Sequence, residues 1–320
     1  MFSRFVSHWT HLSSCSTHVA VLSFPNSGTS FTMDLVAAAS NMSMATNYAN
    51  ENEIGPTDVT LSNVPVIPDT QGPFWLNPSN AHPTAVVLTK THCGGFCHTC
   101  KVLGSAETPH SFMHHCALAE ADVVSVEGNI TTMTKQRHAY DLKEVDRAVH
   151  LFRDPLDNMV SRFHLDVHEL TLRNNNSTLI DLYPLDATGF RRFCLDIMDY
   201  HDEHHDSRVD KRVLRLIEDV PCHYDLFRYI QWHNLAFVTT NDNLNLPTHV
   251  LYYEDYETDL DGTLQSLLDF LELPNTGAKV PFLSGKSYRD YYSEDQVARM
   301  RTAAMMLASP LTWHYLERYF

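Results

Sequence analysis

The segment that joins an apolar run at residues 18–22 to a helical pattern from residue 29 has the composition of an anion-binding loop. Its residues 23–30 read SFPNSGTS. The first backbone N–H groups of a helix lack partners and point at whatever lies in front of them. We therefore expect a phosphate-like group to bind Asn26, Ser27, Gly28, Thr29 and Ser30; an ordinary strand-to-helix turn is the alternative. No lysine follows Gly28, so this is not the GxxxxGK[ST] loop of P-loop NTPases.

A second set of anion-binding side chains follows the apolar run at residues 148–152. Arg153 offers a fixed fork of N–H donors that suits a phosphate. Asp154 and Pro155 predict a helix start, with the aspartate as N-cap and the proline at the first helical position. Ser161, two turns further on, adds a hydroxyl. The alternative is an arginine that caps a strand beside a proline-initiated helix.

Lysine and histidine follow a third apolar run, at residues 85–89, as Lys90 and His92. A histidine titrates near pH 6.5, so its neutral imidazole can take a proton at physiological pH. The chain has 20 histidines, and any one of them is more often a surface or core residue than a catalyst. The position of His92 between two anion-binding segments, at the end of a buried strand, favours a catalytic role.

These three segments, in this order, resemble the motifs of the sulfotransferase family. Residues 23–30 are similar to its 5′-phosphosulfate loop, usually Tyr-Pro-Lys-Ser-Gly-Thr-Thr. Residues 153–161, RDPLDNMVS, resemble its 3′-phosphate motif, and residues 90–92, KTH, resemble its catalytic segment. Residues 251–256, LYYEDY, resemble its late strand and helix. The resemblance spans about residues 19–271.

The resemblance implies an enzyme that moves the sulfuryl group of 3′-phosphoadenosine 5′-phosphosulfate (PAPS) to an acceptor hydroxyl, with no metal required. It implies that His92 is the base and that Lys90 stabilises the transferring group. By the same resemblance, residues 26–30 hold the 5′-phosphosulfate, and Arg153 and Ser161 hold the 3′-phosphate.

The chain departs from the family pattern in two places. Asn26 stands where the family usually has lysine, which removes a cation beside the bridging oxygen. We predict that Asn26→Lys leaves activity intact or raises it. The family's C-terminal Arg-Lys-Gly segment is not recognisable, and the nearest basic residues, Lys286 and Arg289, are expected to contact the 3′-phosphate. Tyr224 and Trp232 stand where the family has adenine-contacting and pocket-wall aromatics, although an aromatic helix face is usually core.

These departures motivate an alternative function, a protein that binds PAPS or its bisphosphate product and has lost catalysis. It predicts tight binding of adenosine 3′,5′-bisphosphate without turnover. A P-loop kinase or NTPase is disfavoured, because the chain has neither the Gly-Lys-Ser/Thr step nor a clear magnesium-binding aspartate after an apolar strand.

Strands that alternate with helices of ten or more residues must position these side chains. We predict strands at 18–24, 85–89, 148–152 and 248–253, with two short strands at 123–126 and 131–134. Helices are predicted at 29–40, 156–169, 190–200, 209–218, 224–239, 260–271 and 293–307. This alternation indicates an α/β fold with a central parallel β-sheet and helices on both faces, the P-loop NTPase-like sulfotransferase fold that the resemblance implies. Ligands of such sheets bind beyond the carboxyl ends of the strands, where the motifs are placed.

We expect residues 1–320 to form one domain, with loop insertions at 41–83 and 93–120. Residues 41–83 are rich in proline, asparagine, threonine and serine, which is typical of a functional surface loop. Phe74 and Trp75 in this segment either line an acceptor pocket or anchor the loop to the core.

Four cysteines follow the histidine of the third motif, and they are Cys93, Cys97, Cys100 and Cys116. Disulfides among them are the better interpretation if the compartment is oxidising. Zinc is the alternative, but structural zinc sites usually combine two paired ligand blocks, and only one is evident.

A formal net charge of −16 argues against nucleic acid and strongly anionic polymers as partners. We expect the acceptor to be a small molecule or a carbohydrate end. No apolar run approaches the ~20 residues of a membrane span, so the chain is expected to be cytoplasmic if complete, or in the Golgi lumen if an N-terminal anchor has been removed. Glycosylation sequons at Asn41, Asn129, Asn175 and Asn176 favour the second option weakly.

Overall fold

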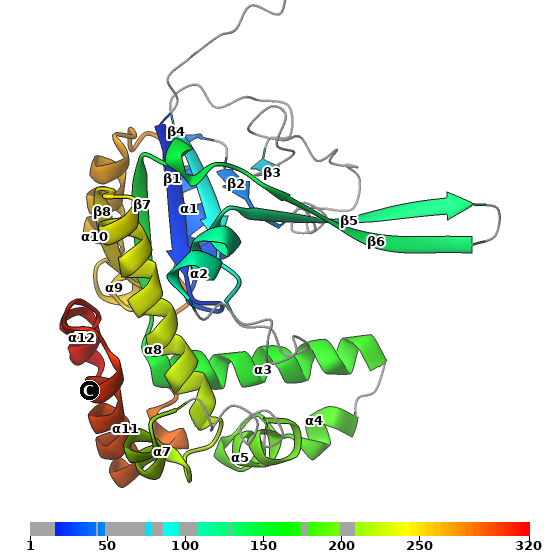
Figure 1. The fold of residues 1–320 in the computed structure, drawn as a ribbon, viewed down its shortest axis with the longest axis vertical. Coiled ribbons are helices and arrows are strands. Elements are labelled where there is room, and N and C mark those ends of the chain that lie inside the picture. Colours follow the sequence, from blue (N-terminus) through cyan, green and yellow to red (C-terminus); the bar gives the residue numbers. More distant parts are fainter. Residues whose placement is uncertain are drawn as a thin grey trace, which may run out of the picture.

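The computed structural model describes residues 17–42, 44–48, 74–77, 86–95, 108–127, 130–174, 178–198 and 209–320. A six-stranded sheet with the order β3-β2-β4-β1-β7-β8 lies at its centre (Figure 1). Its strands are β1 (Thr17–Ser23), β2 (Met44–Thr46), β3 (Phe74–Asn77), β4 (Val86–Thr91), β7 (Arg147–Phe152) and β8 (Thr248–Tyr252). All neighbouring pairs are parallel except β2 and β3. The predicted α/β fold with a central parallel sheet is therefore confirmed.

Helices precede, connect and follow the strands. The longer ones are α1 (Thr29–Ser40), α2 (Pro109–Cys116), α3 (Pro155–Asn174), α8 (His223–Phe237), α10 (Leu260–Leu271) and α11 (Glu294–Leu307). The shorter ones are α4 (Thr178–Leu182), α5 (Ala187–Phe193), α7 (Lys211–Ile217), α9 (Asp255–Thr258) and α12 (Pro310–Leu316). Single 3₁₀ or π turns are η3 (Leu142–Glu144), η4 (Cys194–Met198), η5 (Val238–Asn243), η6 (Arg289–Tyr291) and η7 (Glu317–Tyr319).

Both faces of the sheet are covered, because successive residues of β1 belong to different hydrophobic clusters. Val19 and Val21 pack with the apolar faces of α1 and α10. Ala20 and Leu22 pack with α3, α8 and α11. Alternating side chains point to opposite faces of a strand, so an unbroken apolar run is the pattern of a strand buried on both sides.

The strand order brings the sequence motifs to one edge of the sheet. β1 pairs with β4 on one side and with β7 on the other. The order of the strands therefore reverses at β1, and such a reversal leaves a crevice at the carboxyl ends where ligands of α/β sheets bind. Figure 1 shows the carboxyl end of β1 directed toward α3.

Several elements differ from the prediction. β2 and β3 lie inside the segment 41–83, where we expected only a loop. The two short strands predicted near residues 123 and 131 are a long hairpin, β5 (Leu118–Glu127) and β6 (Ile130–Ala139), which extends away from the body of the molecule (Figure 1).

The bounds of other elements also shifted. β4 continues through Thr91, so Lys90 lies within the strand and His92 directly follows it. The helix predicted at 190–200 is divided into α5 and the π turn η4. Two short C-terminal helical segments, α12 and η7, were not predicted. None of the helices that the structure describes is long and apolar enough to cross a bilayer.

Candidate active site

The loop after β1 has the backbone of an anion-binding turn. Gly28 precedes α1 with a φ of 92°, and a Cβ built on it would lie 2.2 Å from Cδ2 of Tyr253. Only glycine fits, because both the left-handed backbone and the close contact exclude a side chain. The hydroxyls of Ser23 and Thr29 share a hydrogen bond across the loop.

Ser27 is fully buried, and its hydroxyl accepts a hydrogen bond of 3.2 Å from Nδ2 of Asn158 on α3. The same amide nitrogen donates to the carbonyl of Pro25 over 3.0 Å. Asn158 belongs to the second motif, but the amino-acid sequence gave no sign that it would support the loop after β1. The first turn of α3 therefore fixes the shape of the loop after β1.

Asn26 lies between the two predicted anion-binding segments. Its φ is 68°, in the left-handed region that asparagine tolerates better than most residues. Its carbonyl accepts a hydrogen bond of 2.7 Å from Nη1 of Arg153, and its Nδ2 lies 3.5 Å from the hydroxyl of Ser161. The structure thus brings Asn26, Arg153 and Ser161 together.

Arg153 follows β7 and is 3% exposed, yet its guanidinium is only partly satisfied. Nη1 bonds Asn26, the Tyr253 ring lies 4.9 Å beneath the guanidinium carbon, and neither Nε nor Nη2 has a hydrogen-bond partner among the described residues. A buried cation with unused donors is costly unless an anion completes its hydrogen bonds. This edge of Arg153 therefore has the chemistry of a phosphate site.

The imidazole of His92 is oriented by the end of β1. Nδ1 lies 2.9 Å from the carbonyl oxygen of Ser23, which can only accept, so Nδ1 carries the hydrogen and Nε2 carries the lone pair of the neutral ring. Burial, with the nearby positive charge of Lys90, lowers the pKa of His92 to about 3, although the Ser23 hydrogen bond acts in the opposite direction. The free ring is therefore neutral throughout the physiological range.

The backbone of His92 is held from both sides. Its N–H donates to the hydroxyl of Tyr48 over 2.8 Å, and the Tyr48 ring stacks on the imidazole. Its carbonyl accepts a hydrogen bond of 2.8 Å from Nε1 of Trp232 on α8. One turn earlier on α8, the Tyr229 hydroxyl donates to the carbonyl of Arg153 over 2.6 Å. One helix thus contacts the backbone of both His92 and Arg153.

Lys90 connects β4 to the first turn of α1. Its ammonium group donates to the hydroxyl of Ser30 over 3.2 Å, and the side chain is 6% exposed. Thr29 is buried, whereas Ser30 is exposed at the start of the helix. A cation at the N-terminus of α1 adds to the positive end of the helix dipole, and both favour a bound anion.

Carboxylates lie close to Arg153. Burial, with the charges of Asp157 and Glu254, raises the pKa of Asp154 to about 7. These carboxylates, with Tyr253 and Lys286, line a cavity of about 270 Å³. The N–H of Tyr288 donates to Asp157 over 2.7 Å, which places the basic segment 286–289 beside the first turn of α3.

The remaining predicted residues are placed less directly. Arg289 donates to the Tyr319 carbonyl over 2.8 Å and lies 4.0 Å from Asp154, so it reaches the carboxylate cluster next to Arg153. Tyr224 is 3% exposed and stacks on Phe227 in the hydrophobic core. Phe74 and Trp75 lie in β3 at the edge of the sheet.

Sequence reasoning missed Tyr48, Asn158 and Tyr253, because each acts through a contact with a residue distant in sequence. Tyr253 stands in the quoted LYYEDY segment, but no local pattern connects it to Gly28 or Arg153. A tyrosine at the end of a buried strand is a weak signal, since its ring is more often core than ligand-facing.

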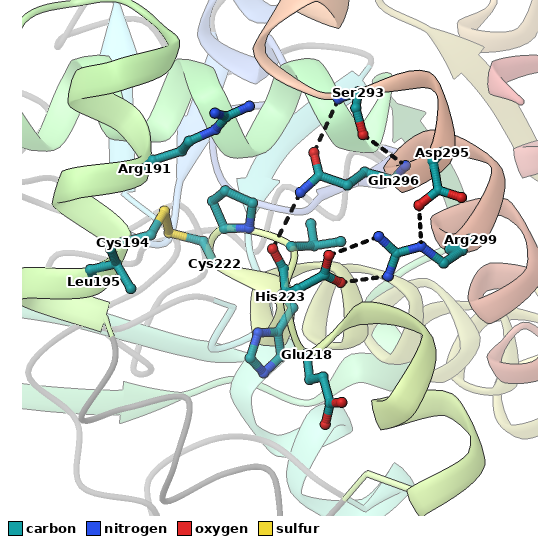
Figure 2. A pocket seen from close by; sticks show the side chains of 13 residues that line it. Arg191, Cys194, Leu195, Glu218, Cys222, His223, Ser293, Asp295, Gln296 and Arg299 are labelled. Carbon is teal, nitrogen blue, oxygen red and sulfur yellow. Dashed lines mark hydrogen bonds and ion pairs between the residues drawn. A yellow bond between two sulfur atoms is a disulfide. The ribbon is translucent and has the colours of Figure 1, made fainter.

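Cys93 and Cys116 form a disulfide directly after His92, in agreement with the disulfide interpretation of the cysteine cluster, and they are not zinc ligands. Cys97 and Cys100 lie outside the described residues. A second disulfide, between Cys194 and Cys222, was not predicted. It lines a cavity of about 480 Å³ between α5, the start of α8 and α11 (Figure 2).

Comparison with known proteins gave one family match. The model described as "Sulfotransferase domain" matches residues 16–306. Among solved structures, this chain is similar to a sulfotransferase from Alicyclobacillus acidocaldarius, whose sequence is 11% identical. The alignment covers 93% of this chain and 98% of the other chain, with a TM-score of 0.38. No curated protein matches.

Proposed function

The chain belongs to the sulfotransferase family, and from this premise we propose that it transfers the sulfuryl group of PAPS to a hydroxyl of a small molecule or a carbohydrate. The transferred group and a phosphate leaving group are what PAPS supplies when it is bound. The chain's own residues bind and orient the substrates and move the proton of the acceptor hydroxyl.

The observation that carries this proposal is the unused edge of the Arg153 guanidinium. Its buried Nε and Nη2 need acceptors that the described residues do not supply. A phosphate monoester offers three oxygens in the geometry that a guanidinium fork matches. The residues present therefore fit a 3′-phosphate, with Arg153 as its main ligand and Ser161 as a second donor.

The loop Asn26–Ser30 fits the 5′-phosphosulfate. The amides at the start of α1, the hydroxyls of Thr29 and Ser30, and the ammonium of Lys90 all supply donors or positive charge there. Asn26 contributes an amide and no charge. We therefore assign to Lys90 the stabilisation of negative charge on the transferring sulfuryl group.

His92 is the proposed base, and Nε2 is the atom that takes the proton from the acceptor hydroxyl. The Ser23 carbonyl stabilises the resulting imidazolium through Nδ1–H. Lys90 contributes to the low pKa of the free ring. A bound anion offsets that charge, so we expect the pKa of His92 to rise when the donor binds.

The basic residues Lys286 and Arg289 are proposed as further ligands of the 3′-phosphate, supported by the contact of their segment with the first turn of α3. Tyr224 is proposed as part of the adenosine pocket wall on the family resemblance alone. We also propose that residues 1–320 form one domain with insertions at 41–83 and 93–120.

The two disulfides in the described part of the chain support a proposal about the compartment. Structural disulfides persist in oxidising environments and are rare in the cytosol. We therefore favour an oxidising compartment such as the Golgi lumen. Seven cysteines minus the four in disulfides leave three, so the native protein should present no more than three free thiols after unfolding without reductant.

The direct test is transfer of a radiolabelled sulfuryl group from PAPS to a library of hydroxyl acceptors. His92→Ala should abolish transfer while retaining affinity for adenosine 3′,5′-bisphosphate, and His314→Ala, at an exposed position, is the matched control. If the His92 variant turns over as fast as the wild type, the histidine is not the base.

The alternative, a nucleotide-binding protein without catalysis, is favoured by the missing lysine at position 26. It predicts bisphosphate binding that depends on Arg153 and no transfer to any acceptor. The same two measurements therefore separate the two functions.

A further inference from the structure

The turn that follows His92 has a backbone conformation that its sequence does not favour. Cys93 and Gly94 have φ values of 48° and 70°, and the N–H of Gly95 donates to the His92 carbonyl over 2.8 Å. This is the pattern of a type I′ turn. Glycine adopts a positive φ readily, but cysteine does so rarely. An interaction outside the turn must therefore hold Cys93 in place.

The disulfide to Cys116, the last residue of α2, supplies that interaction. Thr91 reinforces it through one hydroxyl. Its Oγ1 accepts the N–H of Cys93 over 3.2 Å and donates to the carbonyl of Cys116 over 3.2 Å. The covalent bond and this hydroxyl therefore join the same two residues, and they fix the backbone of Cys93 relative to the end of α2.

Cys116 is in turn held by segments distant in sequence. Besides Thr91, its carbonyl accepts hydrogen bonds from Nδ2 of Asn47 over 2.7 Å and from the Tyr140 hydroxyl over 3.3 Å. Asn47 follows β2 and Tyr140 follows β6. Neither cysteine is more than 3% exposed. The disulfide thus connects the turn to a buried and well-bonded point of the fold.

The conformation of the turn determines how His92 meets the loop after β1. A Cβ on Gly95 would lie 2.6 Å from Cδ of Pro25, and a Cβ on Gly94 would lie 2.7 Å from Cγ of His115. The turn is therefore packed between the anion-binding loop and α2. If Cys93 relaxed to a negative φ, the residues after it would leave this gap and the chain at His92 would rotate.

We propose that Cys93 and Cys116 are positioning residues for the transfer reaction. Their disulfide locks the turn and so keeps the imidazole of His92 hydrogen-bonded to the Ser23 carbonyl through Nδ1. Nε2 then remains the unprotonated nitrogen. The catalytic part of this inference rests on the proposed role of His92 as the base, whereas the structural part does not.

The second disulfide provides a matched control. Cys93 and Cys116 are separated by 23 residues, and Cys194 and Cys222 by 28, so removing either bond restores a similar amount of chain entropy to the unfolded state. In Figure 2, Cys194 and Cys222 line the same cavity as Gln296, Asp295 and Arg299. The residues lining that cavity are not among those we place at the candidate active site, but Cys222 is the N-cap residue of α8, so an effect passed through α8 would lower kcat and nucleotide affinity together.

The experiment compares Cys93→Ala/Cys116→Ala with Cys194→Ala/Cys222→Ala. We expect both double variants to unfold at a lower temperature. Only the first should lose kcat, by about tenfold or more, because a base displaced by about 1 Å loses its geometry. The affinity for adenosine 3′,5′-bisphosphate, measured by calorimetry, should change less than about twofold in both, since Arg153 is untouched. Equal kcat losses in the two variants, or none in the first, would overturn the proposal.

A readout independent of activity is the nitrogen NMR spectrum of the His92 ring. The wild type should show the tautomer protonated at Nδ1, and Cys93→Ala/Cys116→Ala should show a mixture. If His92→Ala were fully active, His92 would not be the base. The spectrum would still test whether the disulfide holds the His92 ring in the tautomer protonated at Nδ1. If the alanine pair does not fold, Cys93→Asn/Cys116→Ala replaces it, because asparagine tolerates positive φ. That variant should retain more of the Nδ1 tautomer than Cys93→Val/Cys116→Ala; equal spectra would overturn the proposal.

Discussion

Nη1 of Arg153 donates a hydrogen bond of 2.7 Å to the carbonyl of Asn26, so the residue after β7 supports the loop after β1 directly. The same guanidinium leaves Nε and Nη2 without partners among the described residues. One edge of the side chain therefore orients the loop, and the other edge is available to an anion.

The substitution Arg153→Lys should show how much nucleotide binding depends on the planar guanidinium and how much on positive charge alone. Lysine keeps the positive charge but cannot donate from a planar fork, so the affinity for adenosine 3′,5′-bisphosphate should fall roughly 10- to 100-fold, about 1.4–3 kcal/mol. Isothermal calorimetry measures this, with the exposed Arg301→Lys as control. Unchanged affinity in Arg153→Lys would place the 3′-phosphate elsewhere.

Asp154→Asn should raise affinity above neutral pH. Burial and neighbouring carboxylates raise the pKa of Asp154 from 3.8 to about 7, so its negative charge appears next to Arg153 as the pH rises through 7. The amide can still accept the N–H of Leu156. Bisphosphate binding at about pH 8 should therefore be severalfold tighter in the variant, with little difference near pH 5. The ligand's own ionisation is common to both proteins and cancels in the comparison.

The same substitution has a defined effect on stability. The pKa of Asp154 is higher in the folded state than in the unfolded state. The free energy of unfolding therefore carries the full contribution of this residue below pH 3.8 and loses it as the pH rises through 7. Relative to the wild type, the stability of the variant should therefore rise between about pH 4 and pH 7, by up to the order of 4 kcal/mol in total. Thermal unfolding followed by circular dichroism would contradict this if the two curves stayed parallel.

Asn26→Lys should keep or raise transfer activity while it lowers thermal stability. The new ammonium would add a cation beside the transferring group, but a φ of 68° costs a lysine about 1–2 kcal/mol more than a glycine and disfavours it relative to asparagine. Asn26→Gly is the control that fits the backbone without adding charge. A large loss of turnover in the lysine variant alone would mean that the site requires the amide.

The histidines of the core should make the fold sensitive to acid. His150 on β7 and His233 on α8 are fully buried, and no ring nitrogen of either has a hydrogen-bond partner among the described residues. Burial lowers the pKa of His150 to about 3 and that of His233 in the same direction. Their contribution to stability is therefore present above pH 6.5 and is lost as the pH falls.

His150→Phe should flatten this dependence. Each unit of pH below 6.5 removes up to about 1.4 kcal/mol per buried imidazole, and the phenyl ring cannot take a proton. The ring would occupy a site already lined by Phe237 and Trp232. The measurement is the melting temperature between about pH 5 and pH 8, with the exposed His314→Phe as control. The same slope in all three proteins would refute the prediction.

The central sheet could be predicted because its strands are continuous apolar runs joined by amphipathic helices. β1 and α1 show this most clearly, since the predicted helix at 29–40 has the observed bounds. β2 and β3 could not be predicted in this way. They have three and four residues, and their place in the sheet depends on the pairing of β2 with β4 and of β3 with β2, which no local pattern encodes.

The candidate site could be predicted only where chemistry and sequence motif coincide. Arg153 and His92 follow strands of the same sheet, and parallel strands bring such residues to one edge. Tyr48 and Trp232 hold the backbone of His92 from segments 44 and 140 residues away. Such contacts are set by the packing of α8 and of the sheet edge, which a single sequence does not reveal.

Two side chains of α8, three residues apart, hold the backbone at the candidate site. Tyr229 donates to the carbonyl of Arg153, and Trp232 donates to the carbonyl of His92. A shift of α8 along its axis would move the backbones of Arg153 and His92 together. In a library of core substitutions on this helix, defects in nucleotide affinity and in turnover should therefore rise and fall as a correlated pair, whereas substitutions at either strand end should separate them.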